Sequence, residues 1–199
     1  MNATAAFLDR LFRNLPPQGR SFAFNSWRHS SRPTGEAVGI LPVPGVNIDS
    51  VAARILDVAG YRGNIDFVVE SRTIPDPRYT PPKGVHFYQR VKIPVLGEVQ
   101  MELALEDFGE RDGWRVIAWS TLEAETNRLD PKRGARFEYN EGAWLLRGDA
   151  VGYSLSSCPR KSDVGRLKFA AMTKGADASA PKMVKANIEG MLAWARRAG

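Results

Sequence analysis

The stretch that decides the fold is VHFYQRVKIPVLGEVQMELALE, residues 85–106. Apolar side chains recur at every second position on both sides of a short break, namely Val85, Phe87, Val91 and Ile93 before it and Val99, Met101, Leu103 and Leu105 after it. Most of the residues between them are polar. A period of two predicts β-strands with one apolar and one solvated face. Because the break is short, the two strands should be antiparallel neighbours.

The same alternation extends to both sides of this stretch. Further strands are predicted over residues 36–41, 65–73, 114–122, 136–140, 143–147, 151–155 and 167–171. Strand 114–122 is apolar on both faces, so its orientation is open. Turn residues such as Gly148-Asp149 separate consecutive strands, which favours antiparallel pairing throughout. The pattern predicts an α+β fold dominated by one long antiparallel meander.

Three helices frame the predicted strands, over residues 4–15, 48–58 and 179–197. Asn47 is the expected cap of the second, because its side-chain oxygen can accept a hydrogen bond from a free amide of the first turn. Prolines and glycines after Leu15 lead into a polar stretch that we expect to be irregular. The chain is therefore divided into an N-terminal amphipathic helix with an irregular extension, 1–35, and a main domain, 36–199.

Length and composition bound the functional class. The chain has 199 residues, of which 43% are hydrophobic and 25% charged, as in a globular domain with a substantial core. Its apolar runs are too short to cross a bilayer. The single cysteine, Cys158, cannot form an internal disulfide, which favours a reducing compartment, and we expect the cytoplasm. The net charge of +6 is spread along the sequence, so no nucleic-acid partner is predicted.

Motifs of metal, nucleotide and nucleophilic chemistry are missing from the sequence: it has no phosphate-binding glycine loop, zinc-type Cys/His cluster or Gly-x-Ser-x-Gly elbow. His29 and His86 are the only imidazoles, and His86 falls in the outward row of its strand. No catalytic residue, metal ligand or cofactor is therefore predicted.

The order of elements resembles the helix-grip fold of the START and polyketide-cyclase-like superfamily (SRPBCC). The resemblance covers residues 36–198 and rests on this order, on Tyr153-Ser154-Leu155 in a late strand and on the closing helix from Pro181 to Arg197. It implies a curved antiparallel sheet wrapped around a long C-terminal helix. It also implies an internal apolar cavity, which members of the superfamily use for lipids, sterols or aromatic molecules.

The inward rows and the closing helix supply the expected ligand-binding residues. These are Phe67, Val69, Phe87, Gln89, Met101, Leu103, Ser120, Tyr139, Tyr153, Met183, Ile188 and Met191. A curved sheet has more inward apolar side chains than one helix can cover, so further helices or a ligand must fill the space. The polar members of the set would fix specificity, because a buried polar group needs a partner.

The leading hypothesis is binding, transport or sensing of a hydrophobic small molecule such as a lipid, sterol or aromatic compound. One alternative is an enzyme of the cyclase or aromatase type in the same fold. The inward rows contain no clear carboxylate or histidine, which favours a non-enzymatic role. A second alternative is a membrane-surface or scaffold module that uses the amphipathic start, residues 4–15, for peripheral membrane contact.

Overall fold

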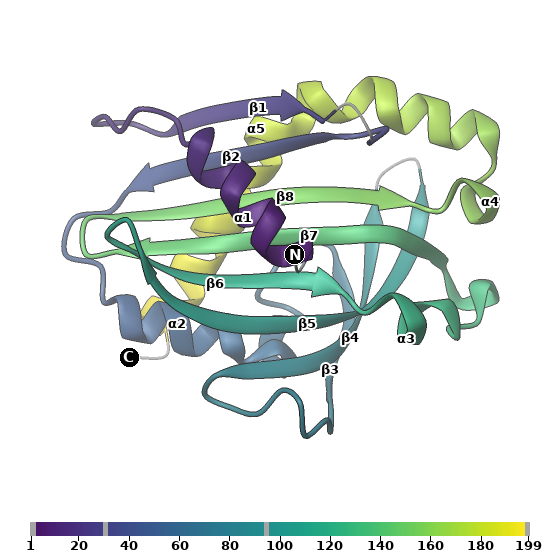
Figure 1. The fold of residues 1–199 in the computed structure, drawn as a ribbon, viewed down its shortest axis with the longest axis horizontal. Helices are drawn as coiled ribbons and strands as arrows, with labels where there is room; N and C mark the ends of the chain where they lie inside the picture. Colours follow the sequence, from purple (N-terminus) through teal and green to yellow (C-terminus); the bar gives the residue numbers. More distant parts are fainter. Residues whose placement is uncertain (1–2, 30–31, 94–95, 198–199) are drawn as a thin grey trace.

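The computed structural model describes residues 3–29, 32–93 and 96–197. It builds the chain around one curved, eight-stranded sheet with the order β1-β2-β8-β7-β6-β5-β4-β3, in which sheet neighbours run antiparallel (Figure 1). The strands are β1 (Ala23–Arg28), β2 (Gly35–Pro42), β3 (Val68–Ile74), β4 (Gly84–Ile93), β5 (Gly97–Arg111), β6 (Trp114–Thr121), β7 (Ala135–Arg147) and β8 (Ala150–Pro159). Strands β3 to β8 follow chain order across the sheet. The predicted α+β class and antiparallel meander are confirmed.

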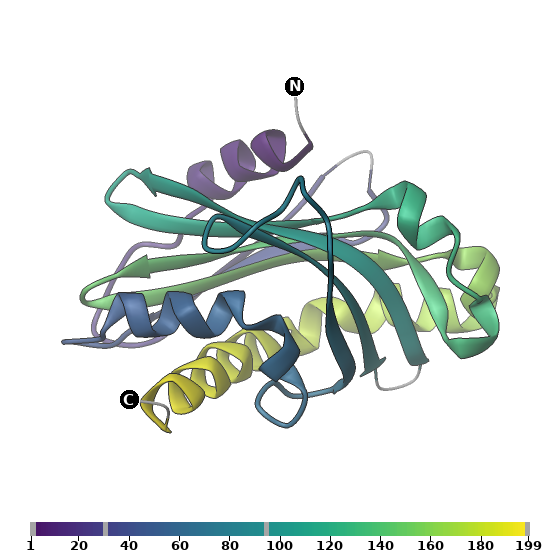
Figure 2. The same cartoon turned by 90° about the horizontal axis from the view of Figure 1, so that it is seen from below.

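Helices lie on both faces of the sheet. Helices α2 (Ile48–Leu56) and α5 (Arg166–Arg197) cover one face, here called the inner face, whereas α1 (Ala3–Arg13) lies against the outer face (Figure 2). The short helices are η1 (Val58–Tyr61), α3 (Glu123–Asn127), η2 (Pro131–Arg133) and α4 (Lys161–Val164). No helix in the described ranges is long and apolar enough to span a membrane.

Strand β6 is apolar on both faces because it lies between two cores. Ile117 and Trp119 pack in the inner core, whereas Val116 and Ala118 pack in the outer core beneath α1. The expected cap of α2 is also confirmed: Asn47 Oδ1 accepts a hydrogen bond from the amide of Ser50 at 3.0 Å. Val51 and Ile55 of α2 share the inner core with Ile117 and Trp119, so α2 packs against the middle of the sheet.

Residues 16–35 are not irregular throughout, contrary to the expectation, since β1 pairs with β2 along its whole length. The strand lacks an alternating apolar pattern because its polar side chains have local partners. Asn25 Nδ2 donates to the carbonyl of Asn14 at 2.8 Å, and Trp27 Nε1 donates to Glu36 at 2.9 Å. Both α1 and β1 therefore pack against strands of the main domain.

The predicted last strand, 167–171, is wrong, because these residues form the first turns of α5. Leu167 is 88% exposed, and the segment is rich in Lys, Ala, Leu and Met, which are strong helix formers. Helix α5 thus begins thirteen residues earlier than expected, at Arg166 instead of Ser179, and Pro181 lies inside it instead of in its first turn. The predicted long C-terminal helix is confirmed in its second half.

Helix α1 is held by apolar and ionic contacts. Phe7 and Leu11 are fully buried against the sheet. Arg10 donates to the Glu36 carboxylate at 2.8–3.1 Å and to Glu141 at 3.1 Å, and burial raises the pKa of Glu141 although Arg32 and Arg10 lower it. The apolar stripe that the second alternative assigns to membrane contact therefore packs against the sheet in this structure.

Candidate functional site

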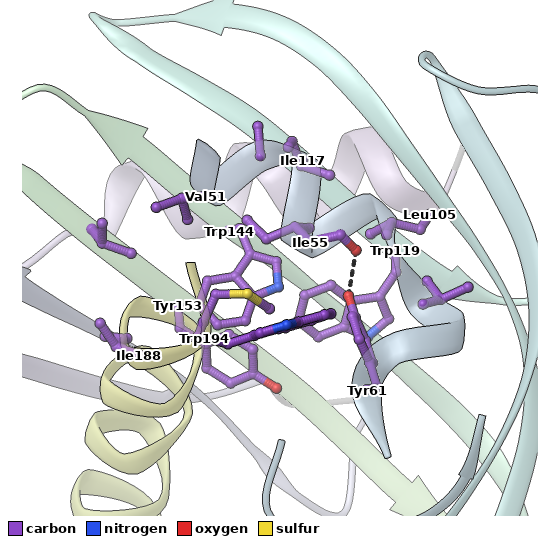
Figure 3. Close-up of a cluster of buried hydrophobic side chains, with 14 of the residues drawn as sticks. Val51, Ile55, Tyr61, Leu105, Ile117, Trp119, Trp144, Tyr153, Ile188 and Trp194 are labelled. Atoms are coloured by element: carbon purple, nitrogen blue, oxygen red, sulfur yellow. Dashed lines mark hydrogen bonds between the residues drawn. The ribbon is translucent and has the colours of Figure 1, made fainter. Parts of the chain in front are cut away.

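The candidate site is the space between the inner face of the sheet and the helices, and aromatic rings occupy it. Tyr61 of η1, Trp119 of β6, Trp144 of β7, Tyr153 of β8 and Trp194 of α5, together called the inner cluster, meet there (Figure 3). The ring of Tyr153 lies 4.6 Å from that of Trp144 and 5.4 Å from that of Trp119. Tyr61 meets Trp194 edge to face at 6.1 Å.

Strand register brings these rings together. Trp144 pairs with Tyr153 between β7 and β8, and side chains of paired residues lie on the same face. Trp119 lies over Gly142, its partner on β7, where a Cβ would overlap both the indole ring and the carbonyl oxygen of Ser154. The glycine therefore makes room for the flat contact of Trp119 with the sheet.

Most polar atoms of the inner wall are satisfied within the protein. Trp119 Nε1 donates to Asn140 Oδ1 at 2.7 Å, and Asn140 Nδ2 lies 3.3 Å from the sulfur of Met101. The hydroxyl of Tyr61 donates to the carbonyl of Ile55 (Figure 3). Burial raises the pKa of both Tyr61 and Tyr153, so both phenols stay neutral at physiological pH.

Ser71 is the exception on this wall. Ser71 of β3 pairs with Gln89 of β4. Gln89 lies two positions after the inward-facing Phe87, so it faces inward, and the side chain of its partner Ser71 lies on the same face. Its hydroxyl oxygen is buried and has no hydrogen-bond partner among the described residues. Because an unsatisfied buried hydroxyl costs about 1–3 kcal/mol, it calls for an explanation.

The structure places most of the predicted ligand-binding residues on the inner side. Seven of them face it, namely Phe87, Gln89, Met101, Leu103, Tyr153, Ile188 and Met191. The strands predicted from the alternation in residues 85–106 account for four of these seven, which is why that part of the set lies together.

Phe67 and Val69 do not follow the predicted row. Phe67 is 54% exposed, has a positive φ of 67° and precedes β3. A register shift lies between Val68 and Glu70, and a bulge of this kind moves side chains to the opposite face. Val68 therefore packs on the inner core, whereas Val69 lies at the bulge.

Ser120, Tyr139 and Met183 also point elsewhere. Ser120 pairs with Ala104 and shares the outer face with Ala118. A register shift between Phe137 and Tyr139 turns Tyr139 outward, where its hydroxyl lies 2.6 Å from Thr34 Oγ1. Met183 is 36% exposed, and the fully buried position on this turn of α5 is Val184.

Four members of the inner cluster, Tyr61 and the three tryptophans, were missed from the sequence. Trp194 lies three residues after Met191 on the buried stripe of α5, so helical spacing was the signal that could have found it. Trp119 was hidden because β6 is apolar on both faces. Tyr61 lies in a one-turn helix beyond the predicted end of the apolar stripe of α2. Neither the apolar spacing of an α-helix nor the alternation of a strand applies to so short an element.

Acid–base groups gather on the outer face. His86 lies there because Phe87 faces inward; its Nδ1 is 3.0 Å from Asp76 and its Nε2 is 2.9 Å from Glu102. Within the described ranges, no group of three His, Cys, Asp or Glu side chains is suited to hold a metal ion. A surface hollow of about 390 Å³ lies nearby at the β3–β4 loop, lined by Asp76, Tyr79 and several prolines, and it opens to solvent.

Comparison with known proteins shows the fold. No family model and no curated protein matches the sequence. A STAR-related lipid transfer protein from Xanthomonas axonopodis has a similar structure (TM-score 0.69, 13% identity, covering 90% of this chain and 96% of the other). Human StAR-related lipid transfer protein 5 is also similar, with a TM-score of 0.68 at 12% identity, covering 98% of this chain and 94% of the other. An aromatase/cyclase from Streptomyces is less similar, with a TM-score of 0.58 at 16% identity, covering 81% of this chain and 93% of the other. The chain has the START-like helix-grip fold that the sequence resembled.

Proposed function

We propose that the protein binds a hydrophobic small molecule, a lipid, sterol or aromatic compound, between the inner face of the sheet and α5. The observation that carries the proposal is the inward-facing Ser71 hydroxyl, whose oxygen is buried beside Gln89 without a partner among the described residues. A ligand oxygen would satisfy it. The names of the similar structures, lipid transfer proteins and an aromatase/cyclase, support the same class of ligand.

Entry of a ligand requires the inner cluster to rearrange. Ring contacts such as those of Tyr153 with Trp144 and Trp119 contribute about 0.5–1.5 kcal/mol each beyond their buried area. Burying roughly 400 Å² of apolar ligand surface contributes about 10 kcal/mol before the cost of association. The gain from apolar burial exceeds the loss of the ring contacts, so rotation of a few rings is compatible with ligand binding.

A carrier or sensor fits the inner wall better than a cyclase does. Because burial raises the pKa of Tyr61 and Tyr153, their phenols are poor bases and serve as hydrogen-bond donors. The imidazole of His86 is bound to two carboxylates on the opposite face. A cytoplasmic location, which the single buried thiol of Cys158 favours, suits such a carrier.

The proposal is tested by native mass spectrometry of the purified protein with extraction of bound lipid, followed by titration with dehydroergosterol or a fluorescent fatty acid. The readout is quenching of, or energy transfer from, the inner tryptophans. Ser71→Ala removes the inward hydroxyl with little change in volume and should weaken binding about three- to tenfold, the value of one neutral hydrogen bond.

Ser120→Ala is the matched control, because this serine also lies on a strand of the sheet, β6, but faces outward. It should leave the affinity unchanged. The proposal is contradicted if both serine variants lose the same affinity for the probe. It is also contradicted if the purified protein carries no lipid and neither probe changes its tryptophan fluorescence.

A further inference from the structure

One end of the molecule carries most of the net charge. Helix α3, η2, α4 and the first turn of α5 lie together at the same end in both views (Figures 1 and 2). Residues 123–136 and 160–168 hold eight basic and four acidic side chains, so they contribute +4 of the chain's net +6. The basic members, here called the basic end, are Arg128, Lys132, Arg133, Arg136, Arg160, Lys161, Arg166 and Lys168. A charge that is spread along the sequence is thus gathered by the fold.

Specific contacts hold these segments side by side. Arg160, which precedes α4, donates to the side chain of Asn127 at the end of α3. Arg136 of β7 donates to the Asn127 carbonyl at 3.1 Å and to Asp163 of α4 at 2.8 Å. This Arg136 contact lowers the pKa of Asp163 to about 2, so the ion pair persists at physiological pH.

Only part of the positive charge is neutralised locally. Arg136 pairs with Asp163, and Arg133 pairs with Glu70. The other basic side chains on the surface of this end are exposed, namely Arg128, Lys132, Lys161, Arg166 and Lys168. They come from two separate stretches of the chain, 123–136 and 160–168, so they form a surface and not a single charged run.

A large apolar side chain projects from the same surface. Leu167 lies between Arg166 and Lys168 in the first turn of α5 and is 88% exposed, more than Phe67 at 54%. Next to it, the ammonium group of Lys161 lies 5.8 Å from the ring of Phe169. One exposed leucine needs no explanation by itself. A protruding leucine within a cationic surface is the combination that binds anionic lipid, because basic residues attract the headgroups and the apolar side chain inserts.

We propose that the basic end docks on an anionic lipid bilayer, with Leu167 inserted between headgroups and Lys161, Arg166 and Lys168 paired with lipid phosphates and carboxylates. Membrane contact then occurs through the start of α5 and not through residues 4–15, whose apolar stripe lies against the sheet. Nucleic acid fits less well, since the most exposed apolar group is a leucine, which offers bases no ring to stack on. The proposal goes beyond small-molecule binding and does not depend on it.

The test is co-sedimentation of the full chain with phosphatidylcholine vesicles that contain or lack phosphatidylserine. The unmodified protein should bind only the anionic vesicles, and raised salt should weaken that binding. Lys161→Gln and Lys168→Gln should each lower the affinity about fivefold, the fold-change that corresponds to about 1 kcal/mol per basic residue at an anionic surface. Leu167→Gln should lower the affinity without changing the salt dependence.

Arg62→Gln and Arg196→Gln are the matched controls, because both residues are exposed but lie outside the basic end. Neither should change vesicle binding. Circular dichroism of all variants should be unchanged, since every replaced side chain is on the surface. Three outcomes would overturn the proposal. The first two are that the unmodified protein does not bind anionic vesicles and that the control variants lose as much affinity as the variants of the basic end. The third is tighter binding to single-stranded RNA with the same dependence on Lys161 and Lys168.

Discussion

At the scale of single residues, Gly142 makes a sharp test of how the inner cluster is built. We expect Gly142→Ala to destabilise the protein by about 3 kcal/mol, the upper range for overpacking. The new methyl group would overlap a rigid indole ring, that of Trp119, and a backbone carbonyl, that of Ser154, and neither can move cheaply. The measurement is the midpoint of urea unfolding followed by circular dichroism.

Gly148 provides the control for this substitution. It lies in the β7–β8 turn, where a Cβ would meet no atom within 4 Å. Gly148→Ala should change stability by less than about 0.5 kcal/mol. If both alanine variants unfold at the same urea concentration, Trp119 does not lie over Gly142 in the way described.

Residue orientation could be predicted from the sequence only where the period of two is unbroken. Phe87 and Met101 face inward as their alternation predicts, because β4 and β5 pair without a shift there. Phe67 and Tyr139 do not, because a register shift lies beside each of them. A bulge reverses the faces of a strand, and pairing with the neighbouring strand, which a sequence pattern does not contain, determines where it forms.

At the scale of elements, α1 is expected to act as part of the core. Leu11→Ala should cost about 3 kcal/mol, as for other large-to-small changes at fully buried positions. Arg13→Ala, at an exposed position of the same helix, should cost less than about 0.5 kcal/mol. Both values come from urea unfolding. A removable membrane arm would give the opposite result: little loss of stability for Leu11→Ala, and intact folding after deletion of residues 1–15.

Elements with a clear period were predictable and elements defined by their partners were not. Helix α2 and strands β4 and β5 follow from apolar spacing and a capping residue. Strand β1 could not be found because its outer side chains, Asn25 and Trp27, are satisfied by Asn14, which follows α1, and by Glu36. The first turns of α5 were predicted as a strand because Leu167 and Phe169 alternate with basic residues. In the structure these turns are continuous with the rest of the helix.

At the scale of the whole molecule, the helix-grip architecture was predictable from the order of elements, but the state of its interior was not. The resemblance implied an internal cavity. In the structure, rings from five elements lie in the space between sheet and α5. The meeting of Tyr61, Trp144 and Trp194 depends on distances between elements far apart in the chain, which periodicity does not encode.

The interior occupied by these rings leads to a test of the binding site as a whole. If the ring of Trp144 must leave Tyr153 before a ligand can enter, Trp144→Ala removes that cost and opens space in advance. The affinity for the fluorescent sterol or fatty acid should then rise about three- to tenfold, the value of the one ring contact between Trp144 and Tyr153. The free energy of unfolding should fall by about 3–5 kcal/mol at the same time.

Trp114→Ala is the control, since this equally buried ring lies in the outer core beneath α1. It should lower stability by a similar amount and leave the affinity unchanged. Titrations well below both melting temperatures separate the two effects. A gain in affinity confined to Trp144→Ala locates the ligand in the inner cluster, whereas a loss, or the same change in both variants, means that the ligand binds elsewhere.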